Sequence, residues 1–529
     1  MKYFSSVLLV FIFLVTSCGS VKPAVQAGKS GAQKPVKIFE YALNSKSTLS
    51  VPTAEKLPQW KGFNLLNLFY LGHSQNDSYF DEEIFLMISE LGFNFVRIPI
   101  DYRIITKSYN RNIMDESALL RLDKAVEYGI KYDIHICINL HRAPGYTVAQ
   151  PRELSNLWTQ NKPQETFAAI WGHLAERYKK VPVKNLSFNF VNEPPDIDEA
   201  VYAAVIKRAA DAIRKSDPDR LLIADGLRYG RNPSKMIREL GIAQAARGYE
   251  PFYVSHYKAD WIDGAMDFPA PVWPFISMPR YLYGIGKPGV RRSIYSIEHE
   301  FKGAYFLDVN IGTVSTEARL IVKADGDIIF NRLFISAKGK GEWKTEVYNK
   351  EWDVYQNIFD RTYRVEIPEG TRFLTLEVTN GDWLTVNDIS FSPVSGNGKT
   401  FKLTPNNSGW DELIPHVKLN ADGNIIFDGD FIPRKWLWEA YFKQWDELIK
   451  SGGVIVGEWG VYNKTPHDTA LRWMEDNLKN FKEAGIGWAL WNFYDAFGII
   501  HSGRDDVDYV DYRGYKLDRK MLDLLQKYQ

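Results

Sequence analysis

The sequence predicts an α/β fold, a TIM (β/α)8 barrel with an all-β domain inserted into one of its loops. Two observations support this fold class. Short apolar runs alternate with amphipathic helical stretches from residue 61 to about 258, and the same alternation resumes near residue 431. Between these stretches the pattern changes to short alternating strands separated by DG, EG and NG turns. The 529 residues suffice for a barrel of about 250 residues and a second domain.

Eight apolar runs are the predicted barrel strands, six before the interruption and two after it. They are residues 62–69, 93–100, 134–141, 186–193, 221–226, 252–257, 453–460 and 487–494. The helices predicted beside them have apolar residues near the i, i+3, i+4 spacing. They are residues 81–91, 116–132, 164–180, 197–216, 434–451, 467–484 and 517–527.

The interruption is an insertion between the sixth strand and the sixth helix. We expect it to span residues 263–430 and to contain a jelly-roll-like β-sandwich at about 296–395. The barrel is then made of residues 41–262 and 431–529. Because the insertion follows a barrel strand, it starts from the face on which TIM barrels place their active sites.

The N-terminus has the form of a secretory signal peptide. Lys2 precedes an apolar run, Val7–Val15, which is too short to span a bilayer. The following "VTSC" resembles a bacterial lipobox, in which Cys18 becomes the lipidated first residue of the mature protein. We therefore expect a lipoprotein signal peptide at 1–17 and a flexible tether at 18–40. The mature protein would be secreted across the inner membrane and lipid-anchored, in the periplasm or at the outer-membrane or cell surface.

The composition narrows the possible partners. The 65 Lys and Arg balance 65 Asp and Glu, so no excess of positive charge favours a nucleic acid. With 45% hydrophobic residues the chain is globular, and its 16 Trp and 29 Tyr suit neutral sugars, although most of these rings are expected in the core. Of the two cysteines, Cys137 lies in an apolar run and is expected to be a buried thiol.

Polar side chains gather at the carboxyl ends of the predicted strands, where TIM barrels hold their active sites. Glu193 ends the fourth strand, in "SFNFVNEPP", and Glu458 ends the seventh, in "VGEWG". Strands four and seven face each other across the mouth of an eight-stranded barrel. Two opposed carboxyl groups on rigid strands are what glycoside hydrolysis requires.

Six other side chains at these ends are predicted to bind substrate or to support the glutamates. Arg97 and a tyrosine would keep Glu458 ionised as the nucleophile, whereas the negative neighbour would raise the pKa of Glu193, the acid and later the base. Asn192 is placed to reach a sugar 2-hydroxyl, and Trp491 offers a face on which a pyranose ring can stack. The complete set is Arg97, His141, Asn192, His256, Tyr257 and Trp491.

The two histidines leave alternatives open. His141 and His256 fit hydrogen-bonded structural residues as well as substrate contacts, and histidines beside glutamates can also bind a metal. No compact ligand spacing such as HExxH is present in the sequence. We therefore predict neither a metal nor another cofactor.

These motifs resemble those of glycoside hydrolase family 5, a cellulase-like, retaining family of clan A with a TIM barrel. The matching stretches in chain order are "FVRIPI", "NLH", "NFVNEPP", "VSHY", "VGEWG" and "LWNF". The resemblance implies that Glu193 is the acid/base and Glu458 the nucleophile. The sequence departs from the family pattern on the predicted sixth strand, where the family commonly has His-x-Tyr with the tyrosine beside the nucleophile. Here Tyr257 follows His256 directly, and Lys258 occupies the expected place.

The predicted function is that of a retaining, endo-acting β-glycoside hydrolase that cleaves a plant-type β-1,4-glucan, cellulose or mixed-linkage glucan, as a monomer. Mannan, xyloglucan and β-1,3-glucan stay open as substrates, and so does transfer of the glycosyl group to a sugar instead of water. An alternative of another class is a lipoprotein that captures glycans without hydrolysis. The inserted sandwich is either a carbohydrate-binding module or cleft wall, or a structural spacer.

Overall fold

The computed structural model describes residues 36–529 except 43, 72–79, 263, 269, 275–277, 285–293, 406–415, 424 and 427–432. The predicted signal peptide, Cys18 and most of the predicted tether lie outside the described residues. Barrel contacts begin at Phe39, two residues before the expected start of the barrel. Its ring is buried, and its backbone N–H donates to the Arg177 carbonyl at 2.8 Å.

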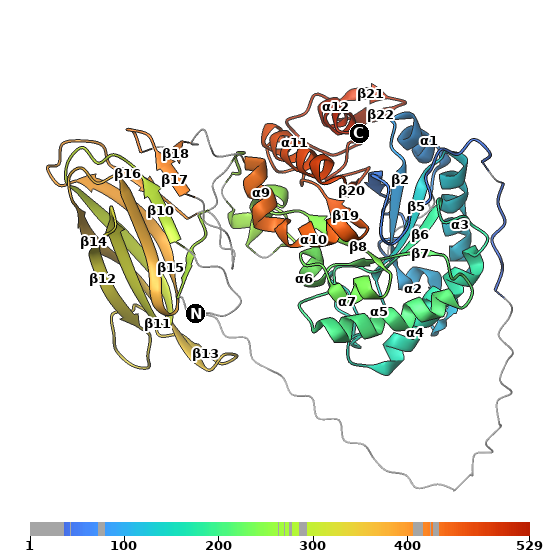
Figure 1. Cartoon of the computed structure of the whole chain (residues 1–529), viewed down its shortest axis with the longest axis horizontal. Helices are drawn as coiled ribbons and strands as arrows, with labels where there is room; N and C mark the ends of the chain where they lie inside the picture. The colour runs from blue at the N-terminus through green and yellow to red at the C-terminus, as the bar shows by residue number, and fades with distance from the viewer. Residues whose placement is uncertain are drawn as a thin grey trace, which may run out of the picture. The chain divides into compact units, whose positions relative to one another are not determined.

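Eight parallel strands close into a barrel, so the predicted TIM barrel is confirmed (Figure 1). Each strand pairs with the next one around the ring, and β20 pairs with β1 to close it. All eight are buried or nearly buried along their length, as expected for parallel strands covered on both faces. In ring order the strands are β1 (Lys61–Asn64), β2 (Phe95–Asp101), β5 (His135–Arg142), β6 (Leu186–Val191), β7 (Leu221–Asp225), β8 (Ala243–Gly248), β19 (Val454–Trp459) and β20 (Gly487–Leu490).

Amphipathic helices lie on the outside of the barrel strands (Figure 1). Four of them begin at an aspartate whose side chain accepts a backbone N–H of the first turn: Asp81, Asp115, Asp198 and Asp518. The longer helices are α1 (Glu82–Glu90), α3 (Glu116–Lys131), α4 (Asn161–Tyr178), α5 (Glu199–Arg214), α9 (Pro433–Tyr441), α11 (His467–Ala484) and α12 (Arg519–Lys527). None of the helices in the described part of the chain is long and apolar enough to cross a membrane.

Short elements connect these units. The helical ones are α2 (Tyr102–Ile105), α6 (Leu227–Gly230), α7 (Lys235–Glu239), α8 (Phe252–Ser255), η1 (Ala265–Asp267), η2 (Lys443–Trp445) and α10 (Asp446–Ser451). Two small hairpins pair β3 (Thr106–Lys107) with β4 (Asn110–Met114) and β21 (Val510–Tyr512) with β22 (Tyr515–Leu517).

The prediction of the sixth strand is wrong. The strand is β8 at Ala243–Gly248, and part of the predicted 252–257 stretch forms the short helix α8. The sequence of β8, "AQAARG", has no β-branched or aromatic residue, so propensity favoured the wrong stretch. Packing requires a small residue at one of these positions, because a Cβ on Gly248 would lie 2.9 Å from Trp459 Cβ on the neighbouring strand.

The insertion between β8 and α9 forms a β domain with its own apolar core, so the predicted all-β insert is confirmed (Figure 1). Its strands run from residue 281 to 426, beyond the expected 296–395, and form one hydrogen-bonded network that includes a parallel pair, β10 with β17. They are β9 (Tyr281–Tyr283), β10 (Ile294–Glu298), β11 (Tyr305–Ala324), β12 (Asp327–Ile335), β13 (Tyr348–Asn349), β14 (Val354–Ile367), β15 (Phe373–Pro393), β16 (Phe401–Leu403), β17 (His416–Leu419) and β18 (Ile425–Ile426).

Candidate active site

Every strand of the barrel contributes a polar or aromatic side chain to the site, in most cases at or near its carboxyl end. Parallel strands end at the same face, so these side chains meet at one mouth of the barrel. In strand order the residues are Asn64 of β1, Arg97 of β2, His141 of β5, Asn192 and Glu193 directly after β6, Asp225 of β7, Arg247 of β8 with Tyr249 just beyond it, Glu458 of β19 and Trp491 directly after β20.

Glu458 is buried and held by three donors. Arg97 Nη1 donates to its Oε1 at 2.5 Å, and Arg247 Nη2 donates to the same oxygen at 3.2 Å. The hydroxyl of Tyr249 donates to Oε2 at 3.2 Å, and His141 Nδ1 lies 4.0 Å from Oε1. Only 3% of the residue is exposed. Two guanidinium groups and a phenol around one carboxyl group suit a carboxylate with a fixed orientation.

Arg97 is fixed by more than its ion pair. Its guanidinium also donates to the side-chain oxygens of Asn189 at 3.0 Å, Asn64 at 3.0 Å and Asn192 at 2.9 Å. The side chain is buried, where an unpaired cation would be costly. These contacts leave Arg97 one orientation, and so fix the position of the Glu458 oxygen that it binds.

Glu193 is more open than Glu458, with 15% of its side chain exposed, and it accepts a hydrogen bond from Arg247 Nε at 3.0 Å. Its backbone is left-handed, with φ of 47°, which is unfavourable for a residue other than glycine. Two contacts hold it there. Its N–H donates to Asp225 Oδ2 at 2.8 Å, and its carbonyl accepts from the Tyr146 hydroxyl at 2.5 Å.

The environment of Glu193 suits a group that carries a proton. Burial, together with the negative charge of Glu458, raises the pKa of Glu193 to about 7, while Arg247 opposes the shift. Near neutral pH this carboxyl group can therefore give up a proton and take one back.

Asn192 presents a donor to the mouth of the barrel. Its Oδ1 accepts hydrogen bonds from Arg97 at 2.9 Å and from Arg247 at 2.8 Å, which fixes the orientation of the amide. Its Nδ2 is buried and has no hydrogen-bond partner among the described residues. An amide held in this way has an N–H free to donate to a bound hydroxyl group.

Trp491 belongs to a small aromatic group at the mouth. Its ring lies edge-on to Phe69 at 5.4 Å and tilted against His141 at 5.5 Å between ring centroids. It is half-buried, so part of its face remains open to a ligand. Burial and the two nearby guanidinium groups, Arg97 and Arg247, hold the pKa of His141 well below its ordinary value, so its ring is neutral at pH 7.

The tyrosine beside Glu458 is Tyr249, and the assignment of Tyr257 to that place is wrong. Tyr257 follows the short helix α8, and its ring is covered by the Lys258 ammonium at 5.2 Å. His256 lies next to Tyr249, with ring centroids 5.1 Å apart, and its Nδ1 is hydrogen-bonded to the Ser255 hydroxyl. The structure therefore places His256 as a buried neighbour of Tyr249 and shows no contact with either glutamate among the described residues.

Sequence reasoning missed four residues of the site: Asn64, Asp225, Arg247 and Tyr249. Asp225 was visible as a charged end to the apolar run "LLIAD", the signal that located Glu193 and Glu458. Arg247 and Tyr249 gave no such signal, because β8, which carries Arg247 and ends just before Tyr249, has no β-branched or aromatic residue.

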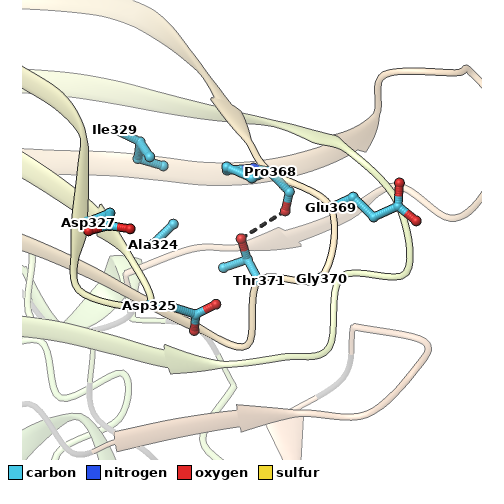
Figure 2. Close-up of a pocket in the computed structure, with 8 residues that line it drawn as sticks. All are labelled: Ala324, Asp325, Asp327, Ile329, Pro368, Glu369, Gly370 and Thr371. Carbon is cyan, nitrogen blue, oxygen red and sulfur yellow. Dashed lines mark hydrogen bonds between the residues drawn. The ribbon is translucent and has the colours of Figure 1, made fainter.

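A hollow in the β domain lies at the turns that join β11 to β12 and β14 to β15 (Figure 2), and its volume is about 230 Å³. Its acidic lining residues are Asp325, Asp327 and Glu369. The carboxylate of Asp325 already accepts the backbone N–H groups of Arg372 and Phe373, so it ties one turn to the other. Within the described ranges no group of three or more His, Cys, Asp or Glu side chains could hold a metal ion.

Known proteins are similar to parts of this chain. Residues 51–241 match the family model for cellulase, glycosyl hydrolase family 5. This stretch contains the first five barrel strands and the motifs "FVRIPI", "NLH" and "NFVNEPP", the last of which carries Glu193. Over these residues the barrel is similar to glycoside hydrolase family 5.

Two curated relatives match over a similar length. Endoglucanase C of Acetivibrio thermocellus is 30% identical over 197 residues, which are 36% of this chain and 57% of that protein. Cellodextrinase A of Ruminococcus flavefaciens is 28% identical over 194 residues, 35% of this chain and 56% of that protein. The chain thus spans a little over half the length of these relatives.

A solved structure described as a glycoside hydrolase extends the likeness beyond the family 5 match. It is 27% identical, with a TM-score of 0.57, and the alignment covers 89% of this chain and 99% of that one. A match of this extent includes most of the chain beyond residue 241.

Proposed function

We propose that the chain is a retaining β-glycoside hydrolase in which Glu193 is the acid/base and Glu458 the nucleophile. The single observation that supports this best is the pair of carboxyl groups bonded to one guanidinium, that of Arg247, in opposite surroundings. Glu458 is buried among donors, whereas Glu193 is partly open and its pKa is raised to about 7. Two carboxyl groups with separate roles are what a double displacement needs.

In the first step a Glu458 oxygen attacks the anomeric carbon and the glycosidic C–O bond breaks. The bonding electron pair goes to the leaving oxygen, which takes the proton of Glu193. The products are a glycosyl ester on Glu458, a free alcohol and an ionised Glu193. The Nδ2 of Asn192, which has no hydrogen-bond partner among the described residues, is suited to donate to the sugar 2-hydroxyl during this step.

In the second step a water oxygen attacks the anomeric carbon, and Glu193 takes a proton from that water. The ester bond breaks and its electron pair returns to Glu458, which regenerates the carboxylate. The configuration at the anomeric carbon is therefore retained. If a sugar hydroxyl replaces the water, the same step transfers the glycosyl group.

The substrate we propose is a β-1,4-glucan, cellulose or mixed-linkage glucan, cut within the chain. The support is the likeness to proteins named endoglucanase C and cellodextrinase A. Reducing-end assays on a panel of β-1,4-glucan, mannan, xyloglucan and β-1,3-glucan test this. Cleavage of mannan alone would show that the proposed substrate is wrong, while the two-glutamate mechanism would stand.

Glu458→Ala tests the mechanism itself. Loss of hydrolysis with glycan binding retained is expected, because the variant keeps the stacking and hydrogen-bonding groups of the mouth. A wild-type protein that binds glycans and cleaves none of the panel would instead support the non-hydrolytic glycan-capturing alternative. Retention is checked by following the anomeric configuration of the first product by NMR.

We also propose that the protein is secreted and anchored to a membrane through a lipid on Cys18, as a monomer. The support is the "VTSC" stretch after the apolar run. Cys18→Ser should move the protein from the membrane fraction to the soluble fraction of cells, with activity unchanged. Size-exclusion chromatography with light scattering of a chain starting at residue 36 tests the monomer.

A further inference from the structure

Arg247 contacts three carboxyl groups of the site. Besides Glu193 and Glu458, its guanidinium donates to the carboxylate of Asp225 and, at 2.8 Å, to Asn192 Oδ1. The side chain is buried, and Gly457 leaves the room that it occupies. The position of Arg247 opposite Glu458 on the neighbouring strand fixes this geometry.

The charges around Arg247 nearly cancel. Two guanidinium groups face three carboxyl groups, so one proton among the three carboxyl groups makes the cluster neutral. The other titratable groups at the site, His141, Tyr146 and Tyr249, add no charge at pH 7, because burial lowers the pKa of the histidine and raises the pKa of both tyrosines. The charged members of the cluster are Arg97, Arg247, Glu193, Asp225 and Glu458.

The first step of the proposed reaction moves a negative charge within the cluster and leaves the total charge of the cluster unchanged. Before the reaction the proton is on Glu193, and Glu458 and Asp225 carry the two negative charges. After the first step Glu458 is a neutral ester and Glu193 has lost its proton, so the negative charge has moved from one partner of Arg247 to the other. Arg247 bonds both partners, through different nitrogens, and can neutralise either without moving.

We propose that Arg247 is a positioning residue that acts as the counter-ion of Glu458 before the glycosyl ester forms and of Glu193 after it has formed. This inference rests on the proposed function and adds a role to a residue outside the two-glutamate mechanism. Its consequence is specific: loss of the guanidinium charge should hinder the second step most at low pH, because ionised Glu193 is then its base and has lost its counter-ion.

The experiment uses 2,4-dinitrophenyl β-cellobioside, whose leaving group needs no proton, so that hydrolysis of the ester limits kcat. For Arg247→Met we expect kcat at pH 6 to fall about 10- to 100-fold, the loss of a hydrogen bond to a charged group. The loss should shrink toward pH 9, because the acidic limb of the pH profile moves upward by at least about one pH unit. Arg247→Lys, which keeps the charge, should keep the limb near its wild-type place.

Arg177 offers a matched control. It is a buried arginine paired with Asp123 and Glu116 on the helices outside the barrel mouth. Arg177→Met should lower stability and leave the pH profile of kcat in place. If Arg247→Met lowers kcat equally at every pH, or if Arg247→Lys shifts the limb as far as Arg247→Met does, the counter-ion role is wrong while the proposed function stands. A wild-type protein that cleaves neither this probe nor any polysaccharide of the panel overturns the proposed function and this inference together.

Discussion

The hydroxyl of Tyr249 donates a hydrogen bond of 3.2 Å to Glu458 Oε2, from the residue that follows the sixth barrel strand by one position. This contact orients the oxygen of Glu458 that neither arginine holds. Tyr257, eight residues later, has no such contact in the described structure.

Tyr249→Phe should therefore lower kcat about 10- to 100-fold, because a hydrogen bond to a charged group contributes roughly 1.5–3 kcal/mol. KM should change less than kcat, because the contact acts on the oxygens of Glu458 during the attack. Tyr257→Phe is the matched control and should leave both constants near wild type. Steady-state kinetics on a soluble oligosaccharide measure this, and equal losses in the two variants would contradict the placement of Tyr249.

We expect kcat/KM to fall as the pH rises through about 7. Glu193 must carry a proton to protonate the leaving oxygen, and burial raises its pKa to about 7, so the active form is lost as the pH rises through that value. Glu193→Gln should lower kcat/KM on polysaccharide about 10²- to 10⁴-fold. The loss should be much smaller for glycosylation by a dinitrophenyl glycoside, whose leaving group needs no proton. An alkaline limb that persists unchanged in Glu193→Gln would assign it to another group.

Glu193→Gln should also stabilise the fold at alkaline pH. The folded-state pKa is raised from an ordinary 4.5 to about 7, so ionised Glu193 opposes folding: the penalty is absent below pH 4.5 and complete above pH 7. The variant removes that penalty, which is at most on the order of 3 kcal/mol. Urea unfolding at pH 4 and pH 8 measures the difference. A gain in the free energy of unfolding that is equal at both pH values would show that burial of the carboxyl group is not its origin.

Trp261 is expected to add a stacking surface beside the site. It is 54% exposed, in the segment after α8, and its ring meets Tyr462 edge-on at 4.8 Å and lies 6.3 Å from His256. Trp261→Ala should raise KM for a soluble oligosaccharide roughly 2- to 10-fold, with little change in kcat.

Trp352, in the β domain, provides the control for Trp261, because it is an exposed tryptophan outside the barrel. Trp352→Ala should leave the KM for the soluble oligosaccharide unchanged. If Trp352→Ala raises KM more than Trp261→Ala does, the stacking surface lies on the β domain and the role of Trp261 is wrong.

Much of the fold could be predicted because its signals are local. Apolar runs alternating with amphipathic helices identified seven of the eight barrel strands, and DG, EG and NG turns identified the β domain. The sixth strand escaped because "AQAARG" has no β-branched or aromatic residue, whereas "FYVSHY" has the higher β-propensity.

The strand ends that hold Glu193 and Glu458 can be located from the chain alone, since a carboxyl group directly after a buried run is a local pattern. The groups that surround the two glutamates depend instead on the folded barrel. Arg247 faces Glu458 through the register of β8 and β19, and Asp225 holds the backbone of Glu193 from the next strand. These contacts join residues 32 to 211 positions apart in the chain, and no local pattern encodes such pairings, because they follow from the closure of the barrel.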